Sequence, residues 1–424
     1  MDRAALTRNI LIGMALGVAC GSILHAFGLG DDNFIMVYLV NGLFDIGGKV
    51  FVISLKLLVV PLVFVSLACG AANLGSSTSV LGIGGKTIVL YLFTTAIAVT
   101  LALTVARIVD PGIGFNLTTH ANYVPPPTPS LKQTIIDIFP ANPIDAMAKG
   151  NMLQVIVFAL LVGVAMNKSG EHGLRVKSML DDWNEVIMRM VMMLMAVAPI
   201  GVFCLLITLF AGLGISAFEG LAKYFFTVLG VLLLHFVLTY GLLLRVLGRL
   251  SPIAFVKRIT PVLAYAFSTS SSNATLPVTL ETAEHRLGVK NEVASFTIPL
   301  GATINMDGTA IMQGVATVFI AQAFNVDITP VGYLTVILTA TLASIGTAGV
   351  PGVGLIMLAM VLQEVGLPVE GIGLILGVDR LLDMTRTAVN VTGDLVVSTI
   401  VARSEGKFDE QVFNRGTEPG GYSI

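Results

Sequence analysis

Long apolar segments are the feature of this sequence that most constrains its fold. A helix needs about 20 predominantly apolar residues to cross the hydrocarbon core of a bilayer. The first half of the chain has six such candidate spans, near residues 9–29, 41–70, 84–109, 151–167, 185–212 and 220–249. The first could instead be read as a cleaved signal peptide, but it is too long for a signal h-region and further spans follow at once. Three spans are longer than a bilayer requires, which predicts tilted helices.

Composition agrees with a membrane protein and excludes other classes. Hydrophobic residues make up 55% and charged residues 12% of the 424 residues, and that charged share is about half the roughly 25% of a soluble domain. Disorder requires high charge and low hydrophobicity, and three cysteines inside apolar runs do not form a disulfide scaffold. With 24 basic and 26 acidic residues, nucleic acid is not an expected partner. We therefore predict an all-α polytopic membrane protein.

Basic residues indicate the orientation of the spans, because cytoplasmic loops are rich in Lys and Arg. They precede the first span and follow the fourth, the sixth and the last, whereas the connections 324–333 and 363–373 contain none. All basic clusters fall on one side only if the segments 258–288 and 334–365 each enter and leave the membrane on the same face. We therefore predict two re-entrant hairpins, with both termini in the cytoplasm and the chain in the plasma (or inner) membrane.

Both predicted hairpins are interrupted at their centres. The first contains Ser270–Asn273, and the second contains the glycine-rich stretch Ser344–Gly354. Unpaired backbone amides cost several kcal/mol in hydrocarbon, so irregular backbone is tolerated only where it lines a cavity or binds a ligand. Each hairpin precedes an apolar span with an Asn–Asp cluster, NMDGT at 305–309 and NVTGD at 390–394. This duplicated pattern is typical of secondary transporters. Ordinary glycine-rich packing helices are the less favoured alternative for either hairpin alone.

The last span, residues 372–402, carries a polar stripe. At about 100° per residue, five side chains fall on one helix face: Asp379, Asp383, Arg386, Asn390 and Asp394. Each charge at mid-bilayer costs on the order of 2.5–3.5 kcal/mol, so the stripe must face protein, water, ions or substrate. Asp383 and Arg386 could satisfy each other one turn apart. Three carboxylates against two arginines, Arg380 included, nevertheless leave excess negative charge, which suits hard cations with oxygen ligands.

The same stripe can recognise an organic ion. The planar fork of Arg386 suits a carboxylate, and Asp383 could hold an ammonium group. Together with the excess negative charge, these groups predict a zwitterion with an additional carboxylate, bound together with cations.

Four motifs in this half of the chain closely resemble the dicarboxylate/amino acid:cation symporter family: SSSNATLP at 270–277, NMDGT at 305–309, GTAGVPGVG at 346–354 and DRLLDMTRTAVNVTGD at 379–394. The resemblance covers the whole chain in layout and is most specific over 258–403. It implies a homotrimer of independent protomers, each with eight transmembrane helices and two re-entrant hairpins in inverted repeats. It also implies an elevator-like movement of a transport domain, with the second hairpin as a gate.

The resemblance divides the chain into a scaffold and a transport domain. The implied parts are a scaffold of the first two spans (1–83), the third span of the transport domain (84–110), a loop with scaffold spans four and five (111–217), the remaining transport domain (218–403) and a cytoplasmic tail (404–424).

The resemblance also implies roles for individual residues. Asp383 would take the amino group of the substrate and Arg386 its side-chain carboxylate. The other implied substrate residues are Ser270, Ser271, Ser272, Thr309, Val350, Pro351, Gly352, Val353, Gly354, Thr387 and Asn390.

Three sodium sites are implied in the same way. The first comprises Gly301, Asn305, Asn390 and Asp394. The second is formed by backbone near Thr303, Met306, Ser344, Ile345 and Thr347. The third comprises Tyr91, Thr94, Thr95 and Asp307, together with Asn305.

Two positions depart from the family pattern. Where many relatives carry a further arginine, this chain has Ser270 and Met384, which puts inferences about potassium or proton countertransport in doubt. Arg380, beside Asp379, could take over that electrostatic role. Proton-coupled members tend to lose acidic or asparagine ligands of the sodium sites, whereas this chain retains them. The resemblance therefore favours sodium as the coupling ion.

We expect a non-enzymatic symporter that imports L-aspartate or L-glutamate with sodium and has no cofactor. A proton-coupled carrier of acidic amino acids or C4-dicarboxylates is the main alternative, although Asp383 argues against a substrate that lacks an amine. An ion channel is a second alternative. An intramembrane enzyme is a third, which no serine–histidine or metal spacing supports. Of the five histidines only His235 lies mid-span, and we predict that it is a packed, hydrogen-bonded residue.

Overall fold

The protein is described by a computed structural model that covers residues 3–29, 33–73, 81–115, 136, 139–214, 216–345, 347, 349 and 352–415. Over these residues the chain is helical, apart from one isolated β-bridge between Val289 and Phe408. The prolines at 125–129, two predicted substrate residues (Val350 and Pro351) and the tail beyond residue 415 lie outside the described residues.

The first half of the chain forms long helices, with the seven-residue α5 as a short one among them. Their bounds are α1 (Arg3–Ala26), η1 (Ile35–Phe44), α2 (Asp45–Asn73), α3 (Leu81–Val109), α5 (Pro143–Lys149), α6 (Met152–Lys168) and α7 (Gly170–Leu213).

The second half is built mostly from shorter helices, with the 33-residue α16 as the exception. Their bounds are α8 (Ser216–Leu234), η3 (His235–Tyr240), α9 (Gly241–Val246), α10 (Pro252–Thr269), α11 (Ser272–Glu281), η4 (Thr282–Arg286), α12 (Asn291–Ile304), α13 (Asp307–Ala323), α14 (Pro330–Ser344), α15 (Val353–Glu364), η5 (Val369–Gly371), α16 (Ile372–Ser404) and α17 (Glu410–Arg415).

Four helical segments of the described chain are long and apolar enough to cross a membrane: Arg8–Ala26, Ile35–Cys69, Gly82–Val109 and Glu219–Val246. A fifth is reached if the two halves of α7, which meet at 45°, count as one span. These segments overlap five of the six spans predicted in the first half, and α6 is a shorter apolar helix at the place of the sixth.

The helices of the second half break where polar and glycine residues interrupt the apolar pattern. Ser270 ends α10 with a φ of +49°, and the Ser271 hydroxyl caps α11 by accepting from the Ala274 N–H at 3.2 Å. The break between α12 and α13 falls at Asn305 and Met306. Before α15, Gly352 has a φ of +86°, a left-handed conformation that glycine adopts without steric penalty. The predicted interruptions are therefore real breaks in the helices.

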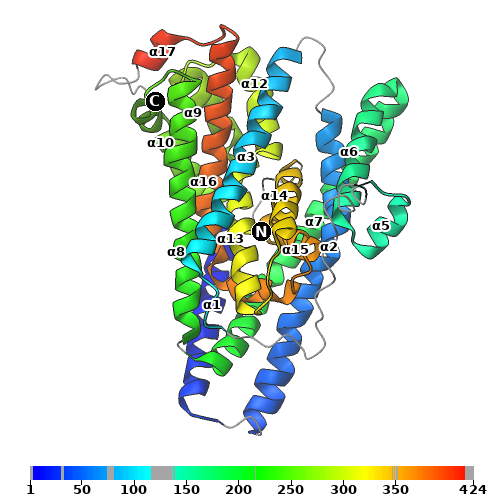
Figure 1. Ribbon diagram of the computed structural model, residues 1–424, viewed down its shortest axis with the longest axis vertical. Coiled ribbons are helices and arrows are strands. Elements are labelled where there is room, and N and C mark those ends of the chain that lie inside the picture. The colour runs from blue at the N-terminus through cyan, green and yellow to red at the C-terminus, as the bar shows by residue number, and fades with distance from the viewer. Residues whose placement is uncertain are drawn as a thin grey trace.

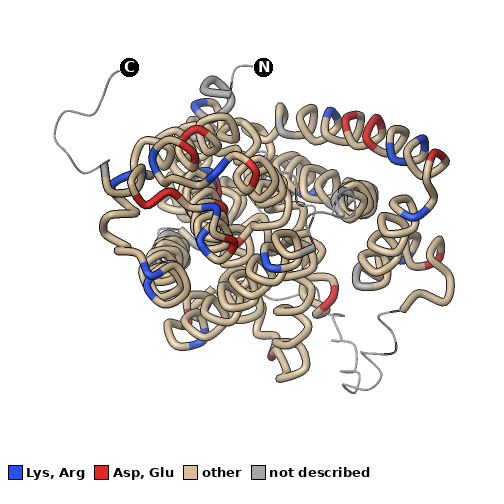
Figure 2. The backbone as a smooth tube through the Cα atoms, turned by 90° about the horizontal axis from the view of Figure 1, so that it is seen from above, with Lys and Arg blue, Asp and Glu red and all other residues tan. Residues whose placement is uncertain are grey.

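By their contacts the helices form two groups. Figure 1 shows α2, α5 and α6 on one side of the molecule and α8, α9, α10 and α16 on the other. In the first group, α7 packs on α1, α2 and α6. In the second, α13 lies against α3, α8 and α16, and the arms of each predicted hairpin, α10 with α11 and α14 with α15, contact each other. Charged residues occupy only a few places on the backbone (Figure 2), as the low charged share requires.

Glycines bring α1 close to α7. Gly13, Gly17 and Gly21 form a stripe on α1 at four-residue spacing, and it faces the segment of α7 that begins at Pro199. A Cβ on Gly17 would lie 2.9 Å from the Phe203 carbonyl oxygen and 3.0 Å from the Leu206 Cβ. Small residues at such an interface let two membrane helices approach closely.

We predict that Gly17→Ala destabilises the protein by about 1–3 kcal/mol, because the added methyl forces α1 away from α7. The measurement is the Tm of the detergent-solubilised protein. Gly230→Ala on α8 is the matched control, since a Cβ there meets nothing within 4 Å. Equal Tm values for the two variants would show that the close approach does not matter.

Candidate substrate and ion site

Arg386 bridges two carboxylates of its own helix. Its Nη1 donates to Asp379 Oδ1 at 2.8 Å, and its Nη2 donates to Asp383 Oδ1 at 2.8 Å. Arg380 Nη1 lies 3.4 Å from Asp383 Oδ2. The four side chains form a cluster with no net charge. The pairing of Asp383 with Arg386 that the spacing allowed is therefore present, and Asp379 is a second partner.

The cluster is buried but not fully satisfied. Arg386 is only 1% exposed, and its Nε has no hydrogen-bond partner among the described residues. A cavity of about 20 Å³ borders Asp379, Arg380 and Asp383. It is lined on its other sides by α1, α7 and the start of α15. That volume holds about one water molecule, so it does not admit an amino acid.

The tips of the two predicted hairpins meet beside this cluster. The Ser271 hydroxyl donates to the Gly349 carbonyl at 2.6 Å. On the second hairpin, a Cβ on Gly354 would lie 3.1 Å from Thr309 Cγ2 and 3.6 Å from Arg386 Nη2. The structure thus brings together side chains from both hairpins, α13 and α16, as the motifs predict.

Burial of the expected substrate residues is nearly uniform. Asp383 is partly buried. The other members that the structure describes are buried: Ser270, Ser271, Ser272, Thr309, Gly352, Val353, Gly354, Arg386, Thr387 and Asn390.

The four residues of the first expected sodium site lie together where α12 ends. Asn305 Nδ2 donates to the Asn390 carbonyl at 3.0 Å and to Asp394 Oδ1 at 2.8 Å. Asn390 Oδ1 accepts from the Gly308 N–H at 2.7 Å, and a Cβ on Gly301 would collide with Asp394 Oδ1. The buried Oδ1 of Asn305 has no partner among the described residues. An unpaired amide oxygen beside a carboxylate fits a hard cation.

The expected residues of the third site also meet. Thr94 Oγ1 donates to the Tyr91 carbonyl at 3.0 Å. Thr95 Oγ1 lies 2.6 Å from Asp307 Oδ1 and 2.9 Å from the same Tyr91 carbonyl oxygen. A hydroxyl has one proton, so it can serve only one of these two acceptors. A cation at this point would relieve the crowding of oxygen lone pairs.

The residues of the expected second site share fewer contacts. Its residues lie on two segments that approach each other, since a Cβ on Gly349 would lie 3.1 Å from the Ala302 carbonyl oxygen. The hydroxyls of Ser344 and Thr347 donate to carbonyls of their own segment, at 2.7 and 2.6 Å. Within the described residues, no hydrogen bond joins Thr303 or Met306 to the second hairpin.

Asp307 has two further partners that the sequence did not reveal. Tyr240 OH donates to Asp307 Oδ2 at 2.8 Å, and His235 Nε2 lies 3.1 Å from the same oxygen. His235 is hydrogen-bonded and buried as predicted, but its partner is a candidate ion ligand. Tyr240 stood out in no motif.

A π-helix explains why sequence periodicity missed this pair. Residues five apart on an α-helix point about 140° away from each other. His235 and Tyr240 lie at the two ends of η3, whose i→i+5 hydrogen bonding brings such residues onto one face. No residue pattern in this segment signals the π-turn.

Within the described residues, two buried carboxylates lack a Lys or Arg partner. The ion pairs of Arg380 and Arg386 involve Asp379 and Asp383. Asp307 and Asp394, in contrast, form no ion pair with Lys or Arg among the described residues, and their contacts are hydroxyl, imidazole and amide groups. The excess negative charge expected from the sequence therefore lies where sodium is expected.

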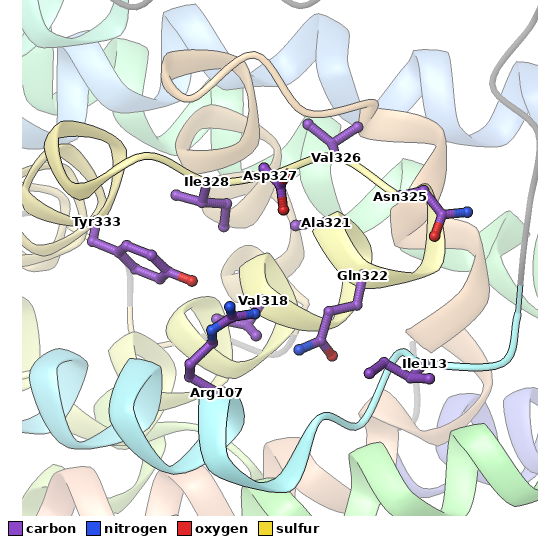
Figure 3. A pocket seen from close by; sticks show the side chains of 10 residues that line it. All are labelled: Arg107, Ile113, Val318, Ala321, Gln322, Asn325, Val326, Asp327, Ile328 and Tyr333. Atoms are coloured by element: carbon purple, nitrogen blue, oxygen red, sulfur yellow. The ribbon is translucent and has the colours of Figure 1, made fainter.

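A larger hollow of about 420 Å³ lies at the ends of α3 and α13 and the start of α14 (Figure 3). Arg107 and Tyr333 point into it. Gln322 on its wall is already engaged, because Nε2 donates to Asp110 Oδ1 at 2.6 Å and Oε1 accepts from the Gly112 N–H at 2.9 Å. The lining contains none of the expected substrate or sodium residues, so size alone does not mark the candidate site.

Comparison with known proteins shows the family of this chain. Residues 6–404 match the sodium:dicarboxylate symporter family. The chain is 33% identical to the proton/glutamate-aspartate symporter of Escherichia coli, over 96% of this chain and 94% of that protein. It is 31% identical to the proton/sodium-glutamate symport protein of Geobacillus stearothermophilus, over 97% of each chain.

A third relative differs in its named substrate. The C4-dicarboxylate transport protein of Rhodospirillum rubrum is 33% identical over 89% of this chain and 86% of that protein. The relatives therefore differ in both coupling ion and substrate. On the match over residues 6–404, this chain belongs to the sodium:dicarboxylate symporter family.

Proposed function

We propose that this protein imports aspartate or glutamate together with sodium ions. The observation that carries the proposal is the division of charge in the buried centre. The Asp–Arg cluster of α16 is neutral as a whole, whereas Asp307 and Asp394 have no Lys or Arg partner among the described residues. Cations would neutralise these two carboxylates, and a zwitterion with an extra carboxylate would bind to the cluster.

Binding to the cluster is an exchange of partners. The side-chain carboxylate of the substrate would replace Asp383 on the Arg386 guanidinium, and its ammonium group would replace Arg386 on Asp383. Removing one member of a buried ion pair is strongly unfavourable. In the exchange, each contact that is lost is matched by one that is gained. Because the neighbouring cavity of about 20 Å³ is too small for the substrate, the second hairpin would first have to move away, which is the role of a gate.

Asn390 is the physical basis that we propose for coupling. It lies one turn beyond Arg386 on α16, and its carbonyl accepts from Asn305, which also donates to Asp394. A substrate that orders this turn would therefore order the sodium ligands, and sodium would order the substrate site. Such linkage is reciprocal, so each ligand raises the affinity of the other by the same factor.

We also propose a division of the molecule into two domains. The helices of 84–110 and 218–403 would form the transport domain, and those of 1–83 and 111–217 would form the scaffold of a homotrimer. The transport domain would move past the scaffold like an elevator, with both hairpins re-entrant and both termini in the cytoplasm. The grouping of helix contacts and the tight α1–α7 interface support a rigid scaffold.

A proton-coupled carrier is the second candidate, because the Escherichia coli relative is named a proton/glutamate-aspartate symporter. We predict that proteoliposomes accumulate aspartate under a sodium gradient at constant pH, and not under a proton gradient without sodium. Accumulation under the proton gradient alone would favour the alternative. Succinate as competitor in the same vesicles tests whether the amine is required.

We predict that Arg386→Ala abolishes binding of aspartate, because the carboxylate of the substrate loses its bidentate partner and Asp379 and Asp383 are left buried and uncompensated. Isothermal titration at saturating sodium measures the effect. Thr385→Ala is the control, since that hydroxyl donates to the Leu381 carbonyl of its own helix. Unchanged aspartate affinity in Arg386→Ala would remove Arg386 from the site.

Asp394→Asn should raise the sodium concentration for half-maximal aspartate binding at least about tenfold, because a buried cation site loses a full negative charge. Thr399→Val is the control, as this buried hydroxyl donates to Leu395 of the same helix. An unaltered sodium titration in Asp394→Asn would exclude this carboxylate as a ligand.

A further inference from the structure

Asp307 holds its two oxygens in different environments. Oδ1 faces the Thr95 hydroxyl, at 2.6 Å, on the side of the expected sodium ligands. Oδ2 faces away from them, toward Tyr240 OH at 2.8 Å and His235 Nε2 at 3.1 Å. Both Asp307 and His235 are 0% exposed, so no bulk water competes for these contacts.

The histidine contact has a defined direction. An ionised carboxylate can only accept hydrogen bonds, so Nε2 is the nitrogen that carries the proton in this contact. The other ring nitrogen, Nδ1, is buried and has no partner among the described residues. The ring packs edge-on against Tyr240, with centroids 4.6 Å apart. Its orientation is therefore set by Asp307 and Tyr240.

The π-helical backbone of η3 places His235 and Tyr240 beside Asp307. π-Turns within helices are frequent at functional sites. The segments η1 and η4 are π-helical as well, but the π-turn of η3 is the one that brings two side chains, His235 and Tyr240, onto the same carboxylate oxygen. A histidine needed only for packing does not require such a turn, and its ring would be expected to satisfy both nitrogens. The geometry points to a role at the carboxylate.

We propose that His235 is a positioning residue for the sodium site at Asp307. By donating to Oδ2 together with Tyr240, it fixes the rotation of the carboxylate so that Oδ1 alone is presented to the ion beside Thr95. Without the N–H, the carboxylate can rotate, and a lone pair of Oδ2 is left buried and unpaired. His235 touches neither substrate nor ion; it acts through Asp307.

This role of His235 rests on the proposed sodium coupling and adds a residue that is not itself an ion ligand. Outer partners of a ligand orient it, and their loss typically lowers metal affinity 10–100-fold. His235→Met keeps a side chain of similar length but has no N–H donor. His235→Gln keeps an N–H within comparable reach. Thr227→Val, on α8, is the control, because that buried hydroxyl donates to the Lys223 carbonyl of its own helix.

The experiment titrates sodium into substrate-free, full-length protein and follows Tm, then measures aspartate affinity at saturating sodium. We expect His235→Met to raise the half-maximal sodium concentration at least about tenfold, with aspartate affinity at saturating sodium within about twofold of the wild type. His235→Gln should recover most of the sodium affinity, and Thr227→Val should match the wild type.

The outcomes separate the two proposals. If wild-type protein does not respond to sodium, the proposed coupling fails. If the wild type responds and His235→Met titrates identically, the positioning role fails. It also fails if sodium and aspartate affinity fall by the same factor, or if Thr227→Val behaves like His235→Met, since both results indicate loss of packing. Should His235→Met not fold, Tyr240→Phe removes the other donor to Oδ2, and an unchanged sodium titration in that variant overturns the proposal.

Discussion

The burial of two carboxylates with no Lys or Arg partner in the described part of the chain is the constraint on which the rest of this protein depends. Asp307 and Asp394 lie inside an apolar helical bundle, where a charge is unfavourable by several kcal/mol unless it is compensated. Hydroxyl, imidazole and amide groups supply part of the compensation. A cation would supply the remainder. A bound cation would therefore stabilise the folded protein, which would link ion binding to conformation.

Broken helices are the second consequence of the same constraint. A continuous helix satisfies its own backbone and offers no main-chain groups to a ligand. Three helices, α10, α12 and α14, end within one region. Side chains bind main-chain groups at these buried ends: the Ser271 hydroxyl donates to the Gly349 carbonyl, and Asn390 Oδ1 accepts from the Gly308 N–H. The polar centre is thus built from helix ends, while α16 runs through it unbroken and carries the charged ladder.

Much of this architecture could be predicted from the sequence. The apolar segments, the breaks near Ser270 and Gly352 and the one-sided stripe on α16 follow from hydropathy, backbone chemistry and helical period, and the structure contains each of them. The proposed sodium site at Asp394 could be assembled only through resemblance, because Gly301 and Asn305 are far from it in the chain. His235 and Tyr240 escaped both routes, since a π-turn leaves no periodic signal.

The sequence by itself determined that the chain is a helical membrane protein with polar centres in its second half, because burial and period act locally along the chain. Helical spacing also allowed the pairing of Asp383 with Arg386 within α16. Only the tertiary structure decided which groups from separate helices meet, as where Asp307 contacts Thr95, Tyr240 and His235. Such contacts depend on how helices pack against one another, and no spacing within a single helix records that packing.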